Sequence, residues 1–176
     1  MRIIAGNLRG RIFDSPHGHR THPMSDKIRG AIFNALGDIE GLTVLDAFAG
    51  SGAIGFEALS RGASRITFID ADKEAQNAIA RNITTLDVAD KAQLLRMYVH
   101  SYLTRNKEPF DVVIADPPYD DLQYKTLDKL PRLVKPGGIL VYSLPPSARL
   151  VLPADMELLQ QKSYGDATLS FYRKII

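Results

Sequence analysis

Short apolar runs alternate along the chain with longer stretches in which apolar residues recur every three or four positions. The short runs predict strands at 43–48, 65–69, 92–97, 110–115 and 139–143. The stretches with helical spacing predict helices at 26–36, 55–61, 73–85, 99–105 and 122–133. Strands that alternate with helices form a parallel sheet, so the pattern predicts a doubly wound α/β fold.

The C-terminal end breaks this alternation. Lys135-Pro136-Gly137-Gly138 is expected to separate the last helix from the strand at 139–143, and two further strands are predicted between 157 and 175. Gly165 and Asp166 lie between these two strands, and a Gly-Asp pair favours the tight turn of an antiparallel hairpin. The sheet is therefore expected to end in a hairpin.

Composition narrows the class of protein. The 176 residues are 45% apolar and 24% charged, which suits a single domain over 1–176. The absence of cysteine excludes disulfides and thiolate chemistry, and the four scattered histidines predict no metal site. No apolar run approaches the roughly 20 residues that span a bilayer, and no leader is recognisable, so we expect a cytoplasmic protein without membrane contact.

Positive charge is concentrated at the N-terminus. Residues 1–30 carry six basic and two acidic side chains, a net charge of +4, whereas the whole chain carries +2. This excess suits the phosphate backbone of a nucleic acid, although a solvated terminus has the same composition. We therefore divide the chain into a basic arm at 1–24 and a catalytic core at 25–176. The expected RNA-binding residues are Arg2, Arg9, Arg11, Arg20, His22, Lys27 and Arg29.

A glycine-rich loop follows the first predicted strand. Gly50, Gly52 and Gly55 let the backbone approach a nucleotide closely, and the helix behind them presents unpaired N–H groups to an anion. Asp70 lies 20 positions after Gly50, at the end of the next strand, where a carboxylate can accept from ribose hydroxyls. The loop therefore predicts a nucleotide cofactor.

The spacing of this loop fits both NAD and S-adenosyl-L-methionine. Asp46 comes before the loop, and its negative charge suits the ammonium group of a methionine moiety but would repel a pyrophosphate. The carboxylate therefore favours S-adenosyl-L-methionine, and an NAD-dependent enzyme remains an alternative.

The segment Asp116-Pro117-Pro118-Tyr119 follows the strand at 110–115. Its prolines fix φ and remove two backbone donors, which leaves carbonyl and carboxylate oxygens to accept from an amine. The ring of Tyr119 can stack on a base taken out of its helix. These four residues are the expected catalytic residues for methylation of an exocyclic amino group. Because neighbouring parallel strands end at one edge, Asp116 should share a cleft with Asp46 and Asp70.

These motifs together make the chain similar to the RsmD-type methyltransferases, a bacterial family that methylates N2 of a guanine in 16S rRNA of the small ribosomal subunit. The resemblance rests on residues 2–11, 45–63 and 116–119 and extends over nearly the whole chain. It implies a Rossmann-like class I methyltransferase fold with a seven-stranded, mostly parallel sheet and an antiparallel last strand. We expect a monomer whose partner is 16S rRNA, free or within a small subunit.

The cofactor's adenine site departs from the family pattern. The family carries an acidic residue after the third strand that accepts from the adenine amino group, and Tyr98 stands there in this chain. The carbonyl of Met97 or the ring of Tyr98 is expected to replace it. The expected cofactor-binding residues are Asp46, Phe48, Gly50, Ser51, Gly52, Asp70, Ala71, Met97 and Tyr98.

Three other functions fit the same motifs. An adenine-N6 DNA methyltransferase would use both the glycine-rich loop and the Asp-Pro-Pro-Tyr segment, but this short chain leaves no room for a separate DNA-recognition domain. A protein glutamine methyltransferase generally has Asn at the position of Asp116. A noncatalytic RNA-binding module on the same fold is the remaining alternative.

Overall fold

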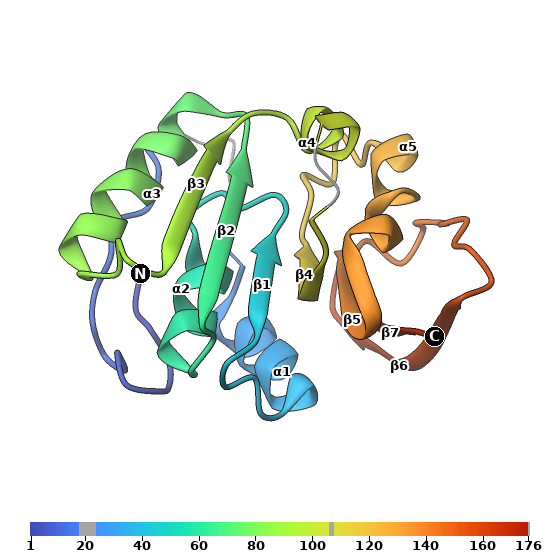
Figure 1. Cartoon of the computed structure of the whole chain (residues 1–176), viewed down its shortest axis with the longest axis horizontal. Coiled ribbons are helices and arrows are strands. Elements are labelled where there is room, and N and C mark those ends of the chain that lie inside the picture. Colours follow the sequence, from blue (N-terminus) through green and yellow to red (C-terminus); the bar gives the residue numbers. More distant parts are fainter. Residues whose placement is uncertain (18–23, 106–107, 176) are drawn as a thin grey trace.

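The computed structural model describes residues 1–17, 24–105 and 108–175. Within these residues lies one seven-stranded sheet in the order β3-β2-β1-β4-β5-β7-β6 (Figure 1). Strands β1 to β5 run parallel, whereas β7 is antiparallel to both β5 and β6. The strands are β1 (Thr43–Asp46), β2 (Arg65–Asp70), β3 (Ala92–Arg96), β4 (Phe110–Ala115), β5 (Val134–Leu144), β6 (Met156–Tyr164) and β7 (Ala167–Lys174). The α/β class, the seven strands and the antiparallel last strand are thus confirmed.

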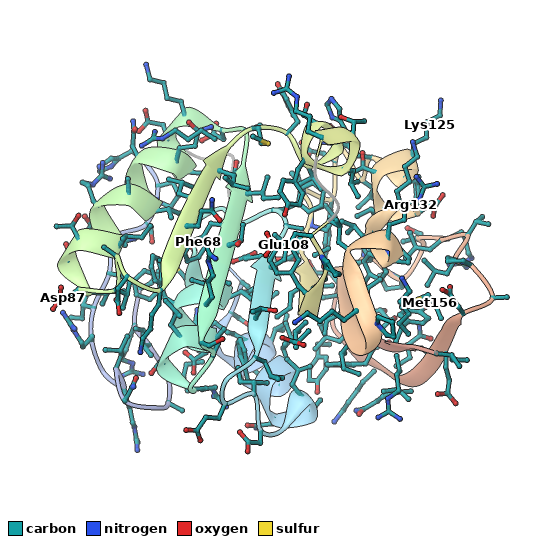
Figure 2. The ribbon with its side chains drawn as sticks, viewed as in Figure 1. Phe68, Asp87, Glu108, Lys125, Arg132 and Met156 are labelled. Carbon is teal, nitrogen blue, oxygen red and sulfur yellow. The ribbon has the colours of Figure 1, made fainter. Side chains whose placement is uncertain are left out.

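Helices cover both faces of this sheet because alternate strand residues point to opposite sides. Val44 packs with α1, α2 and α3 in one apolar cluster, and the adjacent Leu45 packs with α4, α5 and η1 in the other. The interior holds rings such as that of Phe68, whereas Lys125 and Arg132 point outward (Figure 2). The helices are α1 (Asp26–Leu36), α2 (Ala53–Ser60), α3 (Lys73–Thr85), α4 (Val99–Arg105), α5 (Tyr124–Leu127) and the 3-10 helix η1 (Leu130–Leu133). Among the described residues, no helix is long and apolar enough to cross a membrane.

Two predicted elements differ from the structure by more than two residues, and the other boundaries lie within two residues of the prediction. The helix expected at 122–133 is divided into α5 and η1, and Pro131 in the second piece lacks the N–H that a continuous helix would use. The segment 135–138 was expected to precede the fifth strand, but β5 already begins at Val134. Its pairing with β4 is irregular there, because Phe110 pairs with Val134 whereas Val112 pairs with Ile139.

Residues 1–17 of the predicted basic arm are packed onto the fold. Ile3 and Phe13 are buried in the same apolar cluster as α1 and α2. The amides of Ile4 and Ala5 donate to the two carboxylate oxygens of Glu57, at 2.8 and 3.1 Å. The sequence did not predict this packing, because the amides of Ile4 and Ala5 bind a carboxylate more than 50 positions away in the chain.

Candidate active site

Three carboxylates meet at the carboxyl-terminal edge of the sheet. β1 lies between β2 and β4, and the parallel register pairs Asp46 with Phe68 on one side and Ile114 on the other. Asp70 and Asp116 come at or just after the ends of these neighbours. Burial raises the pKa of Asp46 to about 8; the hydrogen bond from Gly55 opposes this rise, and the negative charges of Asp116 and Asp70 contribute to it. The structure therefore brings together the three acids that the sequence placed in one cleft.

The glycine loop is tied to two of these acids. The amide of Gly50 donates to Asp70 Oδ2 at 2.7 Å, and the amide of Gly55 donates to Asp46 Oδ2 at 3.1 Å. A Cβ on Gly55 would collide with the ring of Phe68, so glycine lets α2 lie directly against β2. The loop is held close to the strand ends, where a nucleotide cofactor would lie.

Asp46 is the acid whose surroundings point most directly to a ligand. Its side chain is fully buried, and Oδ1 has no hydrogen-bond partner among the described residues. An unpaired carboxylate oxygen in such a place is costly unless a donor or a cation reaches it. The ammonium group of a methionine moiety supplies both. This observation fits S-adenosyl-L-methionine and does not fit a pyrophosphate.

The centre of the loop is closely packed against α2. Gly52 adopts a left-handed conformation, with φ of 78°, at the N-cap of α2. A Cβ there would lie 2.6 Å from the ring of Phe56, so only glycine fits without a shift. Ser51 is buried beside it, and its Oγ accepts from the amide of Ala53 at 3.3 Å. The packing against Phe56 thus requires glycine at position 52, and contact of the loop backbone with a ligand stays a prediction.

Asp70 accepts more hydrogen bonds from the protein itself than the sequence indicates. Its two carboxylate oxygens accept from the amides of Gly50 and Asp72, at 2.7 and 2.8 Å. Burial still raises the pKa of Asp70, although these hydrogen bonds oppose the rise. Each carboxylate oxygen has a second lone pair, so Asp70 can hold the loop and accept from a hydroxyl at the same time.

The remaining cofactor candidates lie at or near the ends of β1, β2 and β3. Phe48 and Met97 are half-buried at the second apolar cluster, and Ala71 is exposed. Tyr98 is 57% exposed and stacks on His100, with ring centroids 5.3 Å apart and planes 25° from parallel. The ring of Tyr98 therefore offers an aromatic surface where the resemblance to the family predicts an acid.

The Asp-Pro-Pro-Tyr segment leaves β4 at the same edge. Pro117 is buried, Pro118 is exposed and Tyr119 is 37% exposed. Burial raises the pKa of Asp116 to about 6, and a side-chain hydrogen bond with Ser143 opposes this rise. The acid is thus ionised at neutral pH while it is half-buried.

Ser143 is a site residue that the sequence did not reveal. It is buried on β5, and its Oγ lies 3.4 Å from the hydroxyl of Tyr119. It therefore links Asp116 to Tyr119 across the sheet. A lone serine within an apolar strand carries no sequence signal, and only the pairing of β4 with β5 places it beside these residues.

The predicted RNA-binding residues have different surroundings. Arg2, Arg9 and Lys27 are exposed, whereas Arg20 and His22 lie outside the described residues. Arg11 is exposed, but its guanidinium donates to the carbonyls of Leu86 and Thr85 at the end of α3, at 2.9 and 2.6 Å. Arg11 therefore serves the fold by satisfying helix carbonyls that lack partners.

The prediction that Arg29 contacts RNA is wrong. Its side chain is fully buried, with Nη2 donating to the carbonyl of Arg2 at 2.7 Å and to Asp26 at 3.0 Å. Its Nε lies 3.6 Å from Glu57 Oε2. The positive charge of Arg29, which was counted toward a basic surface, therefore lies inside the protein, where no phosphate reaches it.

The strand order, the glycine loop and the buried acid define a Rossmann-like, S-adenosylmethionine-dependent methyltransferase. The model of the family described as "Conserved hypothetical protein 95" matches residues 1–173. The chain belongs to this family, the RsmD family.

Relatives and a solved structure match over nearly the full length. The "Ribosomal RNA small subunit methyltransferase D" of Haemophilus influenzae is 32% identical, over 98% of this chain and 93% of that protein. The protein of the same name from Escherichia coli K12 is 31% identical, over 99% and 90%. A solved Escherichia coli structure described as a candidate methyltransferase has a TM-score of 0.89 and 29% identity, over 99% and 98%. The similarity thus includes the N-terminal segment as well as the cofactor loop.

Proposed function

We propose that this chain transfers a methyl group from S-adenosyl-L-methionine to the exocyclic N2 of a guanine in 16S rRNA, as a monomer in the cytoplasm. The observation that carries the proposal is the single edge that holds Asp46, with its unpaired buried oxygen, and Asp116 with Tyr119. The rRNA substrate is supported by the names of relatives that match the whole chain.

Different residues of the chain would bind different parts of the cofactor. Asp46 would pair with the ammonium group, the loop at Gly50 to Gly52 would contact the carboxylate, and Asp70 would accept from the ribose. Met97 and Tyr98 would line the adenine side, and Phe48 and Ala71 are the other residues expected to contact the cofactor. When bound, S-adenosyl-L-methionine supplies an electrophilic methyl group.

Asp116 and the carbonyl of Pro117 act on the amine. The exocyclic nitrogen of guanine is a weak nucleophile because its lone pair is delocalised into the ring. Acceptors on its hydrogens favour a more pyramidal nitrogen, and the proline pair holds these oxygens in a fixed direction. The nitrogen becomes positively charged as it forms the new bond, so a half-buried anion at Asp116 stabilises charge that appears only in the transition state.

Tyr119 holds the base in place. Its ring is partly exposed, and its hydroxyl is near Ser143 on the neighbouring strand. A ring anchored in this way can stack on guanine, which contributes roughly 1–3 kcal/mol per base. Base stacking and the acceptors on Asp116 together orient the amine for direct transfer.

The proposal is tested by mapping methylated nucleosides in cells with and without this gene. We expect one N2-methylguanosine in 16S rRNA to disappear when the gene is deleted and to return with the wild-type gene. A gene that encodes the Asp116→Ala variant should not restore this N2-methylguanosine. Loss of N6-methyladenine from DNA, or unchanged rRNA, would overturn the proposal.

A further inference from the structure

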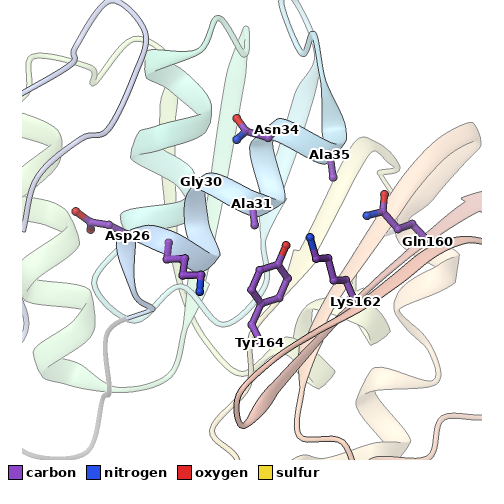
Figure 3. A pocket seen from close by; sticks show the side chains of 9 residues that line it. Asp26, Gly30, Ala31, Asn34, Ala35, Gln160, Lys162 and Tyr164 are labelled. Atoms are coloured by element: carbon purple, nitrogen blue, oxygen red, sulfur yellow. The ribbon is translucent and has the colours of Figure 1, made fainter.

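A groove of about 470 Å³ lies between α1 and the edge strand β6 (Figure 3). It is separate from the three carboxylates. Gln160, Lys162 and Tyr164 line its β6 side, at alternate positions of that strand. Asp26, Lys27, Gly30, Ala31, Asn34 and Ala35 line its α1 side. Asp26 and Tyr164 lie at one end of the groove, and Ala35 and Gln160 lie at the other (Figure 3). The cofactor site described above uses none of these residues.

The charge of the groove is positive. Lys27 and Lys162 are both exposed, one on each wall, and no described carboxylate forms an ion pair with either. The acid of the groove, Asp26, is already paired with Arg29 at 3.0 Å. Two unpaired lysines on facing walls attract an anionic chain that passes between them.

The other lining groups suit a nucleic acid rather than an apolar partner. Lys162 Nζ lies 5.4 Å from the centroid of the Tyr164 ring, so a cation and an aromatic face act together. Asn34 and Gln160 offer amide donors and acceptors to sugars and phosphates. A Cβ added to Gly30 would meet nothing within 4 Å, so the α1 wall is open at that point.

One end of the groove adjoins the catalytic edge. Tyr164 is the last residue of β6, and the hairpin turn after it brings Thr168 beside Leu144, at the carboxyl end of β5. Asp166 in this turn is close enough to Tyr119 for its charge to raise the pKa of the tyrosine. A strand that leaves a base at Tyr119 therefore meets the mouth of the groove at the hairpin.

From this continuity we infer that the groove between α1 and β6 binds the RNA backbone next to the target guanine, with Lys27 and Lys162 on its phosphates. The inference rests on the proposed function and adds the path of the substrate to it. Tyr164 gives the first flanking nucleotide an aromatic face beside the lysine pair.

The test compares two variants with equal changes of charge. Lys27→Gln with Lys162→Gln neutralises the groove, and Arg65→Gln with Lys91→Gln neutralises two exposed cations at the amino ends of β2 and β3. Binding to unmethylated 16S rRNA and to small subunits from a deletion strain is measured against salt. The groove variant should lower the salt slope by about 1.4, since each phosphate contact on a single strand contributes about 0.7.

Kinetics separate this inference from the proposed function. The groove variant should raise KM for rRNA about tenfold, with kcat and affinity for S-adenosylhomocysteine unchanged, whereas the control variant should match wild type. An unchanged salt slope in the groove variant would overturn the inference and leave rRNA methylation by the wild type standing. If the wild type neither binds nor methylates rRNA, the proposed function and the inference both fail.

A crosslink gives a readout that does not depend on charge. With a benzophenone amino acid in place of Tyr164, crosslinks are expected within a few nucleotides of the methylated guanine. Crosslinks to distant RNA, or to a ribosomal protein in the small subunit, would overturn the inference.

Discussion

Two buried carboxylates contact α2, Glu57 as one of its residues and Asp46 through the amide of Gly55, and the protein surrounds them in opposite ways. Glu57, on the side of the N-terminal segment, accepts from two amides and pairs with Arg29 and Arg61. Asp46, on the side of the cofactor loop, accepts from Gly55 and keeps one oxygen without a partner. Because Glu57 has hydrogen-bond donors around its carboxylate, its role is to hold parts of the fold together. Because one oxygen of Asp46 is buried without a donor, we infer that a cation binds there.

Removing the enclosed acid should have the largest effect on stability. Glu57→Ala leaves Arg29 buried without that partner and two N-terminal amides without acceptors. We expect a loss of about 3–5 kcal/mol in the free energy of unfolding, measured by urea denaturation. Glu40→Ala, on the surface, is the control. Equal losses in the two variants would show that Glu57 does not hold the N-terminal segment.

Replacing the other acid should affect the cofactor instead. Asp46→Asn should leave the free energy of unfolding unchanged or higher near neutral pH, because ionising this acid opposes folding. Its affinity for S-adenosylhomocysteine should fall about 10- to 100-fold, the cost of one charge-assisted hydrogen bond. Calorimetry measures the affinity, with the exposed Asp38→Asn as control. Wild-type affinity in Asp46→Asn would contradict the assignment of the ammonium site.

Proton release sharpens the same contrast. The pKa of Asp46 is raised to about 8, so the acid holds a proton at pH 6.5 and must lose it to pair with an ammonium group. Cofactor affinity should therefore rise with pH toward 8. Calorimetry at pH 6.5 in two buffers of different ionisation enthalpy should show one proton released by wild type and none by Asp46→Asn. Equal release by both proteins would contradict this account.

Asp116 differs from Asp46 in having a hydroxyl partner, and the pH dependence of catalysis tests that difference. The rate of a single turnover should fall as pH drops through about 6, because Asp116 gains a proton and no longer accepts from the amine. Ser143→Ala should move this fall to higher pH, since the lost hydrogen bond had lowered the pKa. Ser163→Ala, on the exposed face of β6, should not. An identical profile in all three proteins would remove Ser143 from the site.

The smallest expected effect concerns the adenine side. Tyr98→Asp introduces the acid that the family resemblance predicts after the third strand, so affinity for S-adenosyl-L-methionine should rise about 2- to 10-fold, the value of one hydrogen bond. Tyr98 is largely exposed, so the fold should be unaffected. Weaker binding by calorimetry would show that the ring of Tyr98 contacts the cofactor itself.

The sheet and the cofactor loop could be predicted because their signals are local. The apolar run before Asp116 and the glycines after Asp46 each lie within about ten residues of the element that they define. Chain order then places these ends at one edge of a parallel sheet. The unpaired oxygen of Asp46, by contrast, depends on what surrounds it in three dimensions.

The N-terminal segment could not be predicted in the same way. Its amides find their acceptor in Glu57, more than 50 residues away, and Arg29 is buried against the same acid. A count of charges treats Arg29 and Arg9 alike, although one is enclosed and the other exposed. Ser143 was missed for the same reason, since strand register alone brings it to Tyr119.

The central claim is that the site formed by Asp46, Asp70 and Asp116 transfers a methyl group to guanine N2 in rRNA. Purified protein, labelled S-adenosyl-L-methionine and small subunits from a deletion strain test it directly, with digestion of the 16S rRNA to nucleosides. We expect the label in N2-methylguanosine, with turnover about 100- to 1000-fold lower in Asp116→Ala while that variant still binds S-adenosylhomocysteine. Label in another nucleoside, or undiminished turnover in Asp116→Ala, would contradict the account.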